Sequence, residues 1–224
     1  MIRAIAFDFD GLILDTELPV FRAWKEVFSS YGQRLTLEDW VDNIGRSPDA
    51  FDPCAVLSGL LQRQIDCDRV REDHHLREAQ LIEVQAALPG VESIIKQASK
   101  RELLLGIASS SDRSWVVKHL KRLGLIGFFD TMLCSDDVGQ TKPAPDLYLS
   151  LLSSCGVNPD EAFALEDSPH GVSSAKDAGI FCVAVPNEMT KGLCFDHADL
   201  VLSSLAGVDL GELLRLIEKN TAKG

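Results

Sequence analysis

Short apolar runs alternate with longer amphipathic stretches over most of this chain. Ile2–Phe7 is too short for a helix and is typical of a buried strand. Similar runs occur later, at Leu103–Ala108, Ala162–Leu165 and Ile180–Val185. Apolar residues recur at three- and four-residue spacing in Trp115–Leu123, Leu147–Leu152 and Gly171–Ala178. This alternation predicts an α/β fold in which a parallel sheet carries helices on both faces.

Residues from about 16 to 87 have a different pattern, in which strand-like runs are absent. Helical spacing dominates in Phe21–Phe28, Leu37–Ile44, Ala55–Ile65 and Val70–Leu88. Pro89-Gly90 then marks a turn. The simplest interpretation is a small α-helical cap domain at 16–87, inserted into an α/β core formed by 1–15 and 88–224.

Composition and charge narrow the class of protein. Of the 224 residues, 46% are hydrophobic and 25% charged, which is ordinary for a globular protein. The formal net charge of −12 argues against nucleic acid or an anionic membrane as the main partner. No apolar run is long enough to span a membrane, and the first residues do not resemble a signal peptide. We therefore expect a cytoplasmic protein that acts on a small molecule, and we expect a monomer.

The cysteines and the paired histidines carry no clear chemical signal. The six cysteines form no CxxC pair and no metal-ligand spacing, which predicts reduced residues that mostly pack in the interior. His74 and His75 lie in a charged helical stretch, so we expect them on a solvated face.

The predicted strand ends carry most of the polar chemistry. Ligands of an open parallel sheet bind at the carboxyl ends of its strands. These ends are followed by Asp8-Phe9-Asp10-Gly11, by Ser109-Ser110-Ser111-Asp112, by Lys142-Pro143 and by Glu166-Asp167-Ser168. Several carboxylates, a hydroxyl group and a lysine are therefore predicted to meet at one edge of the sheet.

The residue types indicate phosphoryl transfer. Carboxylates that lie together repel unless a cation separates them, and hard oxygen ligands favour Mg²⁺. Asp8, at the end of a rigid strand, is a candidate nucleophile that would form an aspartyl-phosphate. Asp10 could protonate the leaving group and then activate water. Ser109 and Lys142 could hold the phosphoryl oxygens.

The four motifs resemble those of the haloacid dehalogenase superfamily, in order and approximate spacing. They are DFDGLILDT from Asp8, Ser109 after a strand, Lys142 before Pro143, and Glu166-Asp167-Ser168. The helical insert resembles the small cap of the β-phosphoglucomutase-like branch. The resemblance implies a Mg²⁺-dependent phosphotransferase on a Rossmann-like core. It implies that Ser109, Ser110 and Lys142 bind phosphate. It also implies that the metal is held by Asp8, the carbonyl of Asp10 and Asp167, and that Glu166 binds the metal directly or through water.

Three functions are compatible with this resemblance: a phosphatase, a sugar phosphomutase and a non-catalytic binding module. Hydrolysis fits best. Asp10 and the Glu166-Asp167 pair favour phosphate chemistry over dehalogenation. A sugar phosphomutase is the main alternative, but Val20 and Pro48 stand where mutases carry a histidine and an arginine of the cap. A non-catalytic module that binds a phosphorylated ligand is the third hypothesis.

Candidate substrate-binding residues are Gly45, Arg46 and Arg113, and the expected substrate is a small phosphorylated metabolite such as a sugar phosphate.

Overall fold

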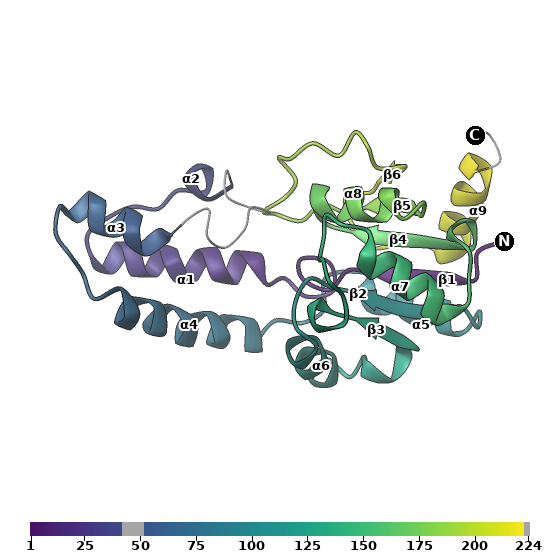
Figure 1. Cartoon of the computed structure of the whole chain (residues 1–224), viewed down its shortest axis with the longest axis horizontal. Helices are drawn as coiled ribbons and strands as arrows, with labels where there is room; N and C mark the ends of the chain where they lie inside the picture. Colours follow the sequence, from purple (N-terminus) through teal and green to yellow (C-terminus); the bar gives the residue numbers. More distant parts are fainter. Residues whose placement is uncertain (42–51, 222–224) are drawn as a thin grey trace. The chain divides into compact units, whose positions relative to one another are not determined.

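The structure is a computed structural model that describes residues 1–41 and 52–221. The chain divides into two compact units (Figure 1). The larger unit comprises Met1–Leu14, Ala86–Asn187 and Lys191–Gly224, and the smaller one comprises Asp15–Gln85 with Glu188–Thr190.

The larger unit is built on a six-stranded parallel sheet, which confirms the predicted fold class. Its strand order is β3-β2-β1-β4-β5-β6. The strands are β1 Ala4–Phe7, β2 Leu104–Ala108, β3 Thr131–Leu133, β4 Ala162–Glu166, β5 Phe181–Ala184 and β6 Leu200–Val201. β1 is central, between β2 and β4, with Phe7 in register with Ile107 and Leu165. The residues that follow β1, β2 and β4 are consequently brought to the same edge of the sheet.

Helices cover both faces of this sheet (Figure 1). They are α5 Val91–Ser99, α6 Arg113–Arg122, α7 Asp146–Cys155, α8 Pro169–Asp177 and α9 Leu210–Thr221. α7 and α8 bury the face that carries Ala4, Ala6 and Ala164. Side chains alternate along a strand, so Ile5 and Phe7 point to the opposite face, where α5 packs on β2. Both faces of β1 are therefore buried, which explains its continuous apolar sequence.

The smaller unit is helical. It contains α1 Glu17–Ser30, α2 Leu37–Val41, α3 Pro53–Leu61 and α4 Cys67–Glu83. α4 packs along α1, and their shared core includes Phe21, Trp24, Phe28 and Val70. Met189, far away in the sequence, belongs to the same core.

The structure corrects three details of the sequence interpretation. α3 ends at Leu61 with Gln62 in a left-handed conformation, and α4 ends at Glu83, so both helices are shorter than predicted. The two-residue strand β6 was not predicted. His74 is only 3% exposed and not on a solvated face, because it continues the buried stripe of Val70 and Ile82 along α4.

The prediction that all cysteines are reduced is also wrong. Cys54 and Cys67 form a disulfide with a Cα–Cα distance of 5.8 Å. Each lies in the first turn of its helix, α3 or α4, and only the packing of those helices brings the two together. The other four cysteines are free thiols, of which Cys134 and Cys182 are buried as predicted.

Among the described residues, no helix combines the length and the apolar character that crossing a bilayer requires.

Candidate active site

Asp8, Lys142 and Glu166 form a buried charge cluster at the carboxyl edge of the sheet. Asp8 directly follows β1, and Glu166 is the last residue of β4. The Lys142 ammonium donates hydrogen bonds to Asp8 Oδ1 at 2.5 Å and pairs with Glu166 Oε1 at 2.6 Å. The three side chains are 9% exposed or less. The edge that was predicted from the strand ends therefore brings these three residues together.

Asp167 joins this cluster, which then contains three carboxylates. Carboxylate oxygens of Asp8, Glu166 and Asp167 lie within 4.8 Å of one another. Glu166 Oε2 is buried and has no hydrogen-bond partner, although a buried carboxylate oxygen normally has one. Three carboxylates, one of which has an unsatisfied oxygen, supply the hard oxygen donors that Mg²⁺ prefers. The residues present fit that ion.

Burial and the charge of Lys142 shift the pKa of Asp8 in opposite directions. The pKa of Asp8 is raised to about 7, mainly by burial and also by the nearby Glu166, whereas Lys142 opposes the rise. The pKa of Lys142 is raised by the two carboxylates even though burial opposes this. We conclude that Lys142 stays protonated and that the ionised form of Asp8 depends on neighbouring positive charge.

Asp10 lies beside this cluster with its carboxylate held by three side chains. Ser111 Oγ donates to Asp10 Oδ2 at 2.7 Å, and Ser109 Oγ lies 3.4 Å from the same oxygen. The indole Nε1 of Trp115 donates to Asp10 Oδ1 at 3.0 Å. Sequence reasoning missed Ser111 and Trp115 as partners of Asp10. Both residues lie shortly after β2 in the sequence, Ser111 in the connecting turn and Trp115 near the start of the following helix. This position is the signal that could have identified them.

We predict that Trp115→Phe lowers kcat for a sugar phosphate about tenfold, while KM changes little. The phenyl ring retains the packing but cannot donate to Asp10, so the carboxylate loses one of the bonds that orient it. Steady-state kinetics measure both constants. Trp24→Phe, in the core of the helical unit, is the matched control. An unchanged kcat in Trp115→Phe would contradict an orienting role for the indole.

Two glycines allow the close packing of the acidic residues. Gly11 has a φ of +80°, and a Cβ atom there would lie 2.1 Å from Asp167 Oδ2. A Cβ atom on Gly171, at the start of α8, would lie 1.9 Å from Glu166 Oε2. Asn187 was not predicted as a site residue, yet its amide donates to Asp167 Oδ2 at 2.7 Å and to the Gly11 carbonyl at 3.0 Å. It thereby orients Asp167 beside the turn that follows β1.

The cluster of acidic residues and lysine agrees with the protein family that the chain matches. The family model for haloacid dehalogenase-like hydrolases matches residues 5–185. The chain belongs to this family. The resemblance seen in the four sequence motifs is thus confirmed.

Several relatives of this hydrolase have phosphatase names. The Bacillus subtilis (strain 168) protein named "Putative phosphatase YhcW" is 40% identical over 214 residues, which is 96% of this chain and 97% of that protein. The "Phosphorylated carbohydrates phosphatase" of Thermotoga maritima is 31% identical over 179 residues, 80% of this chain and 82% of its own length. Together with the family, these relatives support a phosphoric monoester hydrolase.

Two further matches are a solved structure with bound phosphate and a protein that is named as a mutase. The crystal structure of CbbY from Rhodobacter sphaeroides in complex with phosphate has a TM-score of 0.70 and 28% identity, and covers 92% of the hydrolase and 96% of that chain. The "Beta-phosphoglucomutase" of Bacillus subtilis (strain 168) is 27% identical over 219 residues, 95% of this chain and 93% of that protein.

The remaining predicted site residues lie in different environments. Ser109 is buried, and its hydroxyl accepts a hydrogen bond from the backbone N–H of Ser111 at 3.0 Å, whereas Ser110 is exposed. Arg113 is engaged within the larger unit, where it donates to Asp137 at 2.6 Å and to the Met132 carbonyl at 2.8 Å. Gly45 and Arg46 lie outside the described residues.

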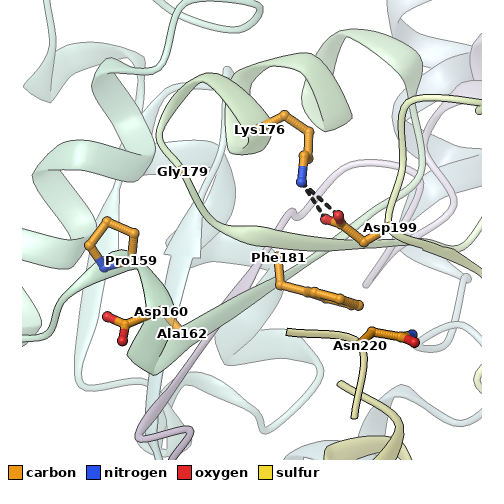
Figure 2. Close-up of a pocket in the computed structure, with 8 residues that line it drawn as sticks. All are labelled: Pro159, Asp160, Ala162, Lys176, Gly179, Phe181, Asp199 and Asn220. Carbon is orange, nitrogen blue, oxygen red and sulfur yellow. Dashed lines mark hydrogen bonds and ion pairs between the residues drawn. The ribbon is translucent and has the colours of Figure 1, made fainter. Parts of the chain in front are cut away.

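The hydrolase also has a cavity of about 400 Å³ that is separate from this cluster (Figure 2). It lies at the amino ends of β4 and β5, near a Lys176–Asp199 ion pair of 2.7 Å, whereas the acidic cluster lies at their carboxyl ends. Its lining residues are Pro159, Asp160, Ala162, Lys176, Gly179, Phe181, Asp199 and Asn220. None of the predicted site residues is among them.

Proposed function

We propose that this hydrolase is a Mg²⁺-dependent phosphatase that acts on a small phosphorylated sugar through an aspartyl-phosphate on Asp8. One observation carries the proposal: a carboxylate at the end of the central strand lies 2.5 Å from a buried lysine and within 4.8 Å of two further acidic side chains. Such a cluster suits an anionic substrate that must be held beside an anionic nucleophile. The phosphatase names of the relatives support the same reaction class.

The first step transfers the phosphoryl group to the enzyme. An Asp8 carboxylate oxygen attacks phosphorus, and the bond between phosphorus and the sugar oxygen breaks. Asp10 gives its proton to the departing oxygen, which leaves as the sugar hydroxyl. Lys142 places positive charge next to Asp8 and next to the oxygens of the transferred group.

The second step releases phosphate. Asp10, now ionised, takes a proton from a water molecule as that water attacks phosphorus. The bond between phosphorus and Asp8 breaks, so the Asp8 carboxylate and inorganic phosphate are regenerated. Ser111 and Trp115 hold the Asp10 carboxylate in place for both transfers.

Asp8, Glu166 and Asp167 would hold Mg²⁺, together with the backbone carbonyl of Asp10. Bound there, Mg²⁺ supplies positive charge that offsets the repulsion between an anionic nucleophile and an anionic phosphate.

A sugar phosphomutase is the second candidate, and the mutase among the relatives supports it. The two activities differ in what accepts the phosphoryl group from Asp8. Water is the acceptor in a phosphatase, and a hydroxyl of a bound sugar phosphate is the acceptor in a mutase. Val20 and Pro48 in place of the mutase's histidine and arginine favour water.

Phosphate release from a panel of sugar phosphates and other phosphomonoesters tests the proposal. The panel is measured with Mg²⁺ and with EDTA. We expect release from at least one sugar phosphate that depends on Mg²⁺. Release that is equally fast in EDTA would contradict the metal requirement, and no release from any phosphomonoester would contradict the phosphatase assignment.

We predict that Asp10→Asn lowers the rate about 10²–10⁴-fold for sugar phosphates and much less for an aryl phosphate. An aryl oxide leaves without needing a proton, whereas a sugar alkoxide is a poor leaving group. Single-turnover rates of leaving-group release, which report the first step alone, measure the difference between the two substrate classes. If both classes lose the same factor, Asp10 is not the acid that protonates the leaving group.

A further inference from the structure

His74, His75 and Glu78 form a compact group on one side of α4, in the helical unit. His74 Nδ1 lies 3.6 Å from Glu78 Oε2, and His75 Nδ1 lies 3.3 Å from the same oxygen. One ligand atom from each side chain lies within 4.8 Å of the others. None of these residues belongs to the acidic cluster of the active site.

His74 is the buried member of the group, and its neighbours fix its orientation. Its side chain is 4% exposed, and its ring stacks on Trp24 with the centroids 4.2 Å apart and the planes 20° apart. Its Nε2 atom lies 3.3 Å from the carbonyl oxygen of Val20 in α1. A carbonyl oxygen can only accept, so Nε2 carries the proton and donates it.

This hydrogen bond leaves the lone pair of His74 on Nδ1. That atom is buried and has no hydrogen-bond partner. It faces a carboxylate oxygen of Glu78, which is also an acceptor, so the two atoms cannot satisfy each other. The 3.6 Å between His74 Nδ1 and Glu78 Oε2 is also too long for a hydrogen bond. A cation between the two atoms would satisfy both.

The distances and the surroundings match a transition-metal site. Zn²⁺ binds imidazole nitrogen and carboxylate oxygen at about 2.0–2.2 Å, which places the ligand atoms of a tetrahedral site about 3.3 Å apart. The two measured separations to Glu78 are 3.3 and 3.6 Å. Metal-binding histidines usually donate their other ring N–H to a carbonyl or carboxylate, as His74 does to Val20. Imidazole ligands also favour Zn²⁺ over Mg²⁺.

We propose that His74, His75 and Glu78 bind one Zn²⁺ ion, with water in the fourth position. The side chain of His75 is 72% exposed, so its ring can rotate to close the third ligand distance. The ion would hold the His74 ring against Trp24 and so stabilise the packing of α4 on α1. The site is independent of the proposed phosphatase chemistry.

Zinc titration calorimetry on the full chain tests this proposal. The protein is first stripped with EDTA and then held in millimolar Mg²⁺, which occupies the acidic cluster at the sheet edge. Wild type should bind one Zn²⁺ per chain. His75→Ala and Glu78→Gln should each weaken binding at least about 100-fold and leave Mg²⁺-dependent phosphate release unchanged. Glu72→Gln on the exposed side of the same helix, and His170→Ala outside the group, are matched controls that should bind as wild type does.

Two further measurements decide where the ion binds and how. Replacing Zn²⁺ by Co²⁺ should give the visible absorption of four-coordinate cobalt in wild type, and this band should be lost in His75→Ala. Asp8→Asn should bind Zn²⁺ as tightly as wild type. The proposal is overturned if wild type binds no Zn²⁺, or if binding is lost in Asp8→Asn but kept in His75→Ala and Glu78→Gln.

Discussion

Asp8→Asn is expected to lower the rate of phosphate release by at least about 10³-fold, because an amide cannot attack phosphorus as a carboxylate does. The variant should remain folded. Burial raises the pKa of Asp8 to about 7, which means that the ionised carboxylate is costly in this position and that a neutral amide of the same shape is tolerated. Lys142 keeps Glu166 as its partner. Turnover and thermal melting, measured on the same preparation, check both expectations.

Asp177→Asn, the same substitution at an exposed position, is the control for Asp8→Asn and should behave as wild type. A well-folded Asp8→Asn protein with normal turnover would show that Asp8 is not the nucleophile. A variant that is inactive because it has unfolded is recognised from its melting curve.

Lys142→Met is expected to reduce both activity and stability. Removal of the ammonium leaves the carboxylates of Asp8 and Glu166 buried and facing each other without a counter-charge. Breaking a buried ion pair in this way costs about 3–5 kcal/mol of unfolding free energy. The loss of positive charge next to the transferred group should lower kcat by about 10²–10³-fold. Chemical denaturation and steady-state kinetics measure the two effects.

The stability deficit of Lys142→Met should shrink as the pH falls. Burial and the nearby Glu166 raise the pKa of Asp8, and without Lys142 nothing opposes this rise, so the folded protein binds more protons than the unfolded chain and lower pH favours folding. Lys121→Met, at an exposed position in α6, is the control and should leave both stability and activity unchanged. A Lys142→Met protein as stable as wild type at neutral pH would contradict the description of the cluster as a buried ion-paired group.

The sheet and its acidic edge could be predicted because they have a local signature. A strand that is buried on both faces is a short, continuous apolar run, and β1, β2, β4 and β5 all have that form. Parallel strands place their carboxyl ends together, so the proximity of Asp8 and Glu166 follows once β1 and β4 are recognised. The two-residue strand β6 is too short to show any periodicity.

Features that depend on packing between distant segments have no local sequence pattern, so they could not be predicted from the sequence. The contact of Trp115 with Asp10 depends on how the turn after β2 is placed against the turn after β1. The Cys54–Cys67 disulfide depends on how α3 meets α4. Met189 joins the core of the helical unit from far away in the chain.

His74 illustrates how a local pattern was misread. The helix α4 is so rich in charged residues that its stripe of Val70, His74 and Ile82 is easily missed. These positions are four and eight residues apart, which is the spacing of one helical face. A histidine within such a stripe is buried, and its polar atoms then require partners. That requirement leads to the proposed zinc site.

The product balance for a sugar phosphate tests the central claim most directly. The substrate consumed, the inorganic phosphate released and any isomeric sugar phosphate are counted in one reaction with Mg²⁺, with and without a sugar bisphosphate activator. A phosphatase that uses Asp8 should release one phosphate for each substrate molecule consumed, should form no isomer under either condition, and should lose this activity in Asp8→Asn. Isomer formation with little phosphate released, especially when it depends on the bisphosphate, would contradict the account and establish a mutase.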